Sequence, residues 1–322
     1  MISLFSLSPL LPLSLFLAFA PQNGPTTVTT TTTVTHAADP LVNVTADGTG
    51  RVNYGAGVVK ATGSGAPPAD GTTSNPVQAR LMSLGAAKAD ALRNLAMAVA
   101  SVQVTSDTRV KNFQTDSDVV ETHVEALLKS ARVIREEIAK DGTATVTMEL
   151  PLYGANSVAA AVLPDVLKPA GDWQGPDKPA VALPPATARP PLVDVRDAGL
   201  TPASDLGPFT SVIVDCRGLG IEAAMAPKLM EDGGKEVYGT VRVDPDYAIA
   251  VGIVGYPRSM GEALRGSRAG AHPLIVRATG AADRHRFNPT VSERDGERIL
   301  EANGRDHFLE RTSVVFLVDP VR

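Results

Sequence analysis

A proline-rich stretch divides this chain of 322 residues and constrains its fold more than any other feature. Ten prolines fall between Ala155 and Pro208, and part of the stretch reads VALPPATARPP, which offers few side chains to pack. Proline has no backbone N–H and interrupts helices and central strands. We therefore expect a linker over 155–208 between two folded domains, 40–154 and 209–322, with a short helix at Ser157–Leu167 packed against the first domain.

The composition predicts packed cores and argues against several classes of function. Hydrophobic residues make up 43% of the chain and charged residues 20%, which is typical of folded domains. The net charge of -5 has the wrong sign for a protein that binds the phosphates of nucleic acid. Cys216 is the single cysteine, so neither an intramolecular disulfide nor a thiolate metal site is expected, and we expect no cofactor.

The N-terminus predicts export. Residues 1–20 form a leucine-rich apolar run that ends in Ala-Phe-Ala, the pattern of a cleaved signal peptide. No Lys or Arg occurs before Arg51, and Pro21 follows the expected cleavage point, so an uncleaved segment that anchors the chain in a membrane is the alternative. A threonine-rich tether is expected over 21–39. We expect a periplasmic or secreted protein with no integral membrane span in the mature chain.

The first domain is predicted to hold two amphipathic helices and an antiparallel sheet. An extended segment around 41–52 and a Gly- and Pro-rich loop from Gly55 to Asn75 precede the first helix, which Asn75 or Ser74 caps. Helical spacing predicts one apolar side that faces the sheet, with Lys88 close to it. That side comprises Val77, Leu81, Leu84, Gly85, Ala89, Leu92, Leu95, Ala96 and Val99.

The second helix and a hairpin complete this domain. The helix is expected to bury Val120, Val124, Leu127, Leu128 and Ala131. The hairpin joins 132–140 to 143–150, whose alternating residues define one core face. A three-residue loop at 140–142 is preferred over a two-residue turn, because it pairs Ile138 with Ala144 and Ile134 with Met148.

These elements carry a family resemblance over residues 40–154. The order is a strand, an alanine-rich helix, the Val-x-Val segment 102–104, a second helix, a Val133-Ile134 strand, an Asp141-Gly142 turn and a closing run that ends Leu-Pro-Leu-Tyr-Gly at Gly154. This region resembles the bacterial surface lipoprotein family of the Helicobacter twenty-kilodalton antigen type, which is similar to the N-terminal domain of flagellar assembly protein T. The resemblance implies a non-enzymatic α+β envelope domain, although the lipid-attachment cysteine of the family is absent.

The second domain is also predicted to be α+β, with strands alternating with short helices. Strands are expected at 210–215, 228–230, 236–241, 248–254, 273–278 and 312–318, and helices at 259–268 and 293–302. Ser292 is expected to cap the last helix, with Asp295 at its third position. The domain resembles a C-terminal module of uncharacterised secreted bacterial proteins, and this resemblance implies no function.

The sharpest local pattern lies where the first strand of this domain ends. Asp215 and Arg217 are followed by Gly218 and Gly220. A dinucleotide fingerprint would require a helix to begin at these glycines, and Pro227 leaves too little room for one. Two interpretations remain, a ligand or anion site at the strand end and an ordinary surface ion pair beside a tight turn.

No catalytic or metal-binding set emerges from the remaining residues. Cys216 follows an apolar strand, where a buried thiol is usual, and the five histidines lack the spacing of metal ligands. We expect an exported, non-enzymatic envelope protein of two α+β domains that acts as a binding or assembly module, with envelope proteins as partners; the flagellar resemblance extends this to a surface appendage. A homo-oligomer is left open, and the alternative is a small-ligand binder or hydrolase with its site near Asp215 and Arg217.

Overall fold

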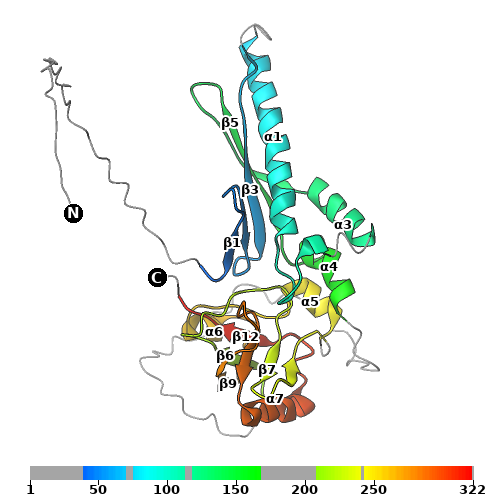
Figure 1. The fold of residues 1–322 in the computed structure, drawn as a ribbon, viewed down its shortest axis with the longest axis vertical. Helices are drawn as coiled ribbons and strands as arrows, with labels where there is room; N and C mark the ends of the chain where they lie inside the picture. Colours follow the sequence, from blue (N-terminus) through cyan, green and yellow to red (C-terminus); the bar gives the residue numbers. More distant parts are fainter. Residues whose placement is uncertain (1–38, 70–74, 113–117, 168–207, 241–242, 321–322) are drawn as a thin grey trace, which may run out of the picture. The chain divides into compact units, whose positions relative to one another are not determined.

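A computed structural model describes residues 39–69, 75–112, 118–167, 208–240 and 243–320 (Figure 1). The signal segment, all of the tether but its last residue, and most of the proline-rich linker lie outside these residues. The fold is α+β, as the sequence predicts, and the described residues belong to one compact unit. We call residues 39–167 the N-terminal region and residues 208–320 the C-terminal region.

The N-terminal region is built on a five-stranded antiparallel sheet. Its order is β1-β2-β3-β5-β4, so β4 forms one edge. The strands are β1 (Val42–Val44), β2 (Gly50–Asn53), β3 (Val58–Gly65), β4 (Arg132–Ile138) and β5 (Ala144–Pro151). The prediction of a loop from Gly55 to Asn75 is wrong over β3, which is the central strand.

The glycines that suggested a loop instead let β3 approach the helix α1 (Pro76–Ala100) closely. A Cβ atom on Gly63 would lie 2.0 Å from the backbone nitrogen of Ala91, and one on Gly65 would lie 2.2 Å from the carbonyl oxygen of Ser83. Glycine is thus required for contact rather than for a turn. The helix is capped by the Asn75 side chain, as predicted.

The side of α1 that faces the sheet is made of small residues, not of the predicted apolar ones. The helix buries Ser83, Ala87, Ala91, Asn94, Leu95, Ala98 and Val99. Of the predicted apolar side, Leu95 and Val99 are buried, whereas Val77 and Leu81 are 64% and 65% exposed and Gly85 and Ala89 are also exposed. The prediction is therefore wrong for the first half of the helix, because a close approach to glycines selects small side chains.

The β4–β5 hairpin has the predicted three-residue loop. Ile138 pairs with Ala144, and the Ala139 amide donates to the Thr143 carbonyl. The second predicted pair is wrong, because a bulge at Ile134 shifts the register and places Val133 opposite Met148.

Helices α3 and α4 also belong to the described part of the N-terminal region. Helix α3 (Asp118–Lys129) buries Val120, Val124 and Leu127 as predicted, and it contacts α1 and α4. Helix α4 (Val158–Val166) begins after Ser157, whose hydroxyl accepts from the Ala160 amide. The helix that we expected at the start of the linker is therefore present.

The C-terminal region contains two small sheets. The first is parallel, with the order β12 (Val314–Leu317), β6 (Ser211–Asp215), β9 (Pro273–Arg277). The second is mixed, with the order β10 (Gly280–Ala281), β11 (Pro289–Val291), β7 (Leu229–Glu231), β8 (Glu236–Tyr238). Its helices are α5 (Pro245–Val251), α6 (Met260–Arg265) and α7 (Glu293–Asp306).

Two sequence predictions for this region require correction. The strand expected at 248–254 is largely helix α5, because Asp244 caps it and Pro245 occupies its first position, both of which start helices. Helix α7 begins at the predicted Ser292 cap but continues beyond Asn303-Gly304 to a left-handed His307 with φ of 51°.

The two regions share one hydrophobic core. A single cluster of buried residues includes Leu95, Val104 and Leu152 of the N-terminal region together with Met225 and Phe316 of the C-terminal region. Backbone hydrogen bonds cross between the regions, from Met225 to Gln103 and from Ala226 to Val104. Among the described residues, no helix combines the length and apolar character needed to cross a membrane.

Candidate functional site

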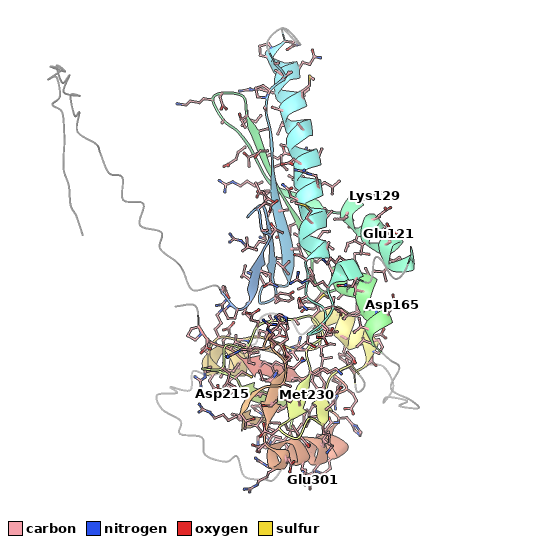
Figure 2. All side chains as sticks on the ribbon, viewed as in Figure 1. Glu121, Lys129, Asp165, Asp215, Met230 and Glu301 are labelled. Atoms are coloured by element: carbon pink, nitrogen blue, oxygen red, sulfur yellow. The ribbon has the colours of Figure 1, made fainter. Side chains whose placement is uncertain are left out.

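The structure places the predicted site at the carboxyl end of β6, the central strand of the parallel sheet (Figure 2). Asp215 is buried, and its carboxylate accepts two hydrogen bonds from the Arg217 guanidinium, at 2.8 Å from Nε and 2.7 Å from Nη2. The Arg217 amide donates to the same carboxylate at 3.2 Å. The two residues are therefore satisfied by each other, which is the ion-pair interpretation of this pattern.

The charge of Asp215 is stabilised where it lies. The hydrogen bond from the Arg217 side chain holds the pKa of the Asp215 carboxyl below its usual value, and the charge of Arg277 acts in the same direction. Asp215 is therefore ionised at neutral pH, and a general acid at this position would require the opposite shift.

The glycines form the tight turn that the sequence predicts. Gly218 and Gly220 have φ angles of 83° and 62°, which glycine adopts at little cost. The Gly218 amide donates to the Asp319 carboxylate at 2.9 Å, and Arg286 donates to the Leu219 carbonyl at 2.5 Å. The Gly218 amide is therefore bonded within the protein rather than directed at a ligand.

Cys216 is buried beside this turn. Burial raises the pKa of its thiol, and the charges of Asp215 and Asp319 raise it further. A nucleophilic cysteine needs a lowered pKa, so this setting is unlike a reactive one.

The histidines are spread over the molecule. His123 lies on α3, His272 stacks on the ring of Phe209 at a centroid distance of 5.0 Å, and His307 ends α7. His285 lies in the loop between β10 and β11, and His36 is outside the described residues. Within the described part of the chain, no group of three or more His, Cys, Asp or Glu side chains is arranged to hold a metal ion.

Among the described residues, hollows away from Asp215 and Arg217 include the following two. One of about 420 Å³ lies between α3 and α4 and is lined by His123, Leu127 and Ser157. The other, of about 400 Å³, lies beside α7, and its lining includes Arg294, Arg298, Glu301, Arg305, Phe209 and Leu274. Glu301 on α7 and Asp215 on β6 belong to different elements of the C-terminal region (Figure 2).

A surface that sequence reasoning missed lies on α1 and β4. Of the nine exposed large hydrophobic residues among those described, seven lie on these two elements: Val77, Leu81, Met82, Met97, Val133, Ile134 and Ile138. The other two are Val44 and Leu264. Exposed large apolar side chains that share one face mark contact sites more often than isolated ones do.

An ion pair shows how the two elements are oriented. Lys88 of α1 lies 2.8 Å from Glu136 of β4. Val77 and Leu81 precede Lys88 by eleven and seven residues, which places all three along one stripe of the helix. On β4, Val133, Glu136 and Ile138 pair in that order with Met148, Val146 and Ala144 of β5. Every second residue of a strand points to the same face of the sheet, so these three β4 residues share one face.

We call this the α1–β4 surface and define it by Val77, Leu81 and Lys88 of α1 with Val133, Glu136 and Ile138 of β4. The sequence contained a signal for this surface, because both the apolar stripe of the helix and the nearby Lys88 were predicted from it. What could not be seen was that the sheet would pack against a neighbouring side of the helix and leave the first half of the stripe uncovered.

Comparison with known proteins gives a match to one family model. Residues 211–320 match the model of the second domain of Treponema pallidum Tp0624. The match covers about a third of the chain and coincides with the C-terminal region, which begins at β6 and ends after β12. No curated protein matched the chain.

Proposed function

We propose that this chain is a non-enzymatic binding or assembly protein of the bacterial envelope, and that it acts through the α1–β4 surface. The observation that carries the proposal is the set of exposed apolar side chains there, with Leu81 at 65% and Val133 at 40% exposure. A large side chain fully buried by a partner contributes about 1.5–3 kcal/mol relative to its exposed state, so a few of them are enough to drive association.

The polar candidates support binding at a small-molecule site less well. Asp215 and Arg217 bond to each other, and the adjacent Cys216 is buried. The alternative, a small-ligand binder or hydrolase near Asp215 and Arg217, would require this ion pair to open before either group could contact a substrate.

The predicted signal peptide supports the envelope location. The apolar run at residues 1–20 has the form of a signal peptide, and the resemblance of residues 40–154 to an envelope lipoprotein family points to the same compartment. The proposal predicts a protein in the periplasmic or secreted fraction whose first residue follows Ala20. Fractionation with N-terminal sequencing measures this, and a chain that retains residues 1–20 in the membrane fraction would support the anchored alternative.

The binding role can be tested with matched surface variants. The purified chain is immobilised and exposed to an envelope extract, and retained proteins are identified by mass spectrometry. Leu81→Glu should abolish retention, because it places a charge in the apolar stripe. Leu264→Glu is the control, since Leu264 is exposed at 37% on α6, outside the surface.

Two results would count against the proposal. One is retention that Leu81→Glu and Leu264→Glu affect equally. The other is saturable binding of a small anion, such as inorganic phosphate or succinate, that Arg217→Ala removes while Leu81→Glu does not; this result would favour the ligand-binding alternative.

A further inference from the structure

We propose that the partner of the α1–β4 surface is a second copy of this chain, and that the two β4 strands pair in antiparallel orientation with Glu136 of one copy opposite Glu136 of the other. This inference rests on the binding role proposed above and names its partner. Three features of the molecule support it: the open edge of β4, the order of charges along that edge and the position of Lys88.

The first observation is that β4 is an edge strand with an open side. It pairs with β5 on one side, and all seven of its residues are exposed. The backbone N–H and C=O groups on the other side of an edge strand are a template for another strand. Charged residues usually protect such edges, and β4 carries Arg132, Arg135, Glu136 and Glu137. Protection fails, however, when the charges of two edges complement each other.

The second observation is that the charges of β4 complement themselves in one register. Two identical antiparallel strands related by a two-fold axis place each residue opposite a residue on the same face of the sheet. With Glu136 on the axis, Arg135 lies opposite Glu137 of the second copy. Because Ile134 is bulged out of the ladder, Val133 then lies opposite Ile138 of the second copy. Because of the two-fold axis, the Arg135–Glu137 pair and the Val133–Ile138 pair each occur twice in the dimer.

Neighbouring registers are worse in both respects. A shift in one direction places Arg135 opposite itself and Val133 opposite Glu136. A shift in the other direction places Glu137 opposite itself and Ile138 opposite Glu136. Like charges directly opposite each other destabilise a strand pair, and each apolar residue loses its apolar partner. The sequence of β4 therefore selects the register centred on Glu136.

The third observation is that Lys88 neutralises the one remaining like-charge contact in that register. Glu136 would face Glu136 of the second copy, but each carboxylate is already paired with Lys88 of its own chain at 2.8 Å. Arg135 and Glu137, which lie on the opposite face of the sheet, pair with each other at 2.5 Å within one copy. In the dimer each can contact its counterpart across the interface as well, so the ion pairs become a network across both copies.

A single-cysteine experiment tests the register. In the unmodified chain Cys216 is buried, so a cysteine introduced on β4 is the only accessible thiol among the described residues. Glu136→Cys should form a disulfide-linked dimer under mild oxidation, because the two introduced thiols face each other. Arg135→Cys is the matched control one position away; its thiol would face Glu137 and should link at least ten-fold more slowly.

The mass of the unmodified chain provides the second test. Light scattering at increasing protein concentration should give twice the mass of one chain. Arg135→Glu should weaken the dimer at least ten-fold, and the double variant Arg135→Glu with Glu137→Arg should restore it, because the charge pair is exchanged rather than removed. Circular dichroism of each variant reports whether it is folded.

Two outcomes would overturn the inference. One is a chain that stays monomeric up to its solubility limit; the other is a dimer in which Glu136→Cys links no faster than Arg135→Cys. Neither outcome decides the proposed function, because retention of a different envelope protein through Leu81 would still support a binding role without self-pairing.

Discussion

The packing of β3 against α1 predicts that alanine substitutions at Gly63 and Gly85 change the free energy of unfolding in opposite directions. In Gly63→Ala the new Cβ would lie 2.0 Å from the Ala91 nitrogen and 2.5 Å from the Ala87 carbonyl oxygen. Both blocking atoms belong to the helix backbone, so they cannot move aside as a side chain would, and the whole helix must shift. Overpacking a core costs about 1–3 kcal/mol and sometimes more, and we expect about 3 kcal/mol here.

The matched variant is Gly85→Ala on α1. A Cβ at this position meets no atom within 4 Å, and the residue is exposed in the helix interior. Alanine is favoured over glycine in a helix by about 0.5–1 kcal/mol, so this variant should be more stable than the parent chain.

Urea unfolding followed by circular dichroism measures both effects. The midpoint should fall for Gly63→Ala and rise for Gly85→Ala, with unchanged slopes if the native and unfolded states keep their compactness. At roughly 2–4 °C per kcal/mol for a unit of this size, the corresponding changes in Tm are a decrease of roughly 6–12 °C and an increase of about 1–4 °C. A Gly63→Ala chain that unfolds at the parent midpoint would refute the argument that glycine permits this contact.

Three further predictions concern buried polar groups. Arg217→Met should destabilise the chain by about 1–3 kcal/mol at neutral pH, because it leaves the buried Asp215 carboxylate without its partner, whereas Arg93→Met at an exposed pair should cost less than about 1 kcal/mol. The pKa of Asp215 is lowered in the folded chain, so the pair contributes its stability above the pKa of an unfolded aspartate. This stability is lost as the pH falls through the pKa of Asp215 in the folded chain. The urea midpoints of the parent and of Arg217→Met should therefore converge in acid. Arg268→Met should cost about 3 kcal/mol or more, because the buried guanidinium donates to the carbonyls of three residues that would lose their donors, and a loss below about 1 kcal/mol would contradict this role. Cys216 should react with a thiol reagent only when the chain unfolds, and prompt labelling of the native chain at pH 8 would show that its burial is wrong.

Sequence reasoning predicted the fold class and several local signals because these depend on neighbouring residues. The Asn75 and Ser292 caps, the short helix after Ser157 and the hairpin loop at 140–142 all follow from short-range chemistry. The glycine turn at Gly218 is of the same kind, since positive φ is a local requirement.

The errors arise where partners are distant in sequence. Gly63 and Gly65 resemble loop glycines until a helix some twenty to thirty residues later is placed against them. The same contact decides which side of α1 is buried, so the apolar stripe with Val77 and Leu81 could be recognised but not oriented. Asp215 and Arg217 lie at the end of β6, as the predicted strand placed them, but the sequence left open whether they would bind each other or a ligand.

Because the two regions share a hydrophobic core, their association does not depend only on the peptide segment that connects them. Hydrogen bonds between the two regions join Met225 to Gln103 and Ala226 to Val104. These contacts do not require an uncut segment 168–207. A chain cleaved once within that segment should therefore elute as a single noncovalent complex, and the two fragments should reassociate when mixed. Transplanting residues 211–320 into another protein would require the host to supply a matching apolar seam, which limits how freely evolution can exchange this module.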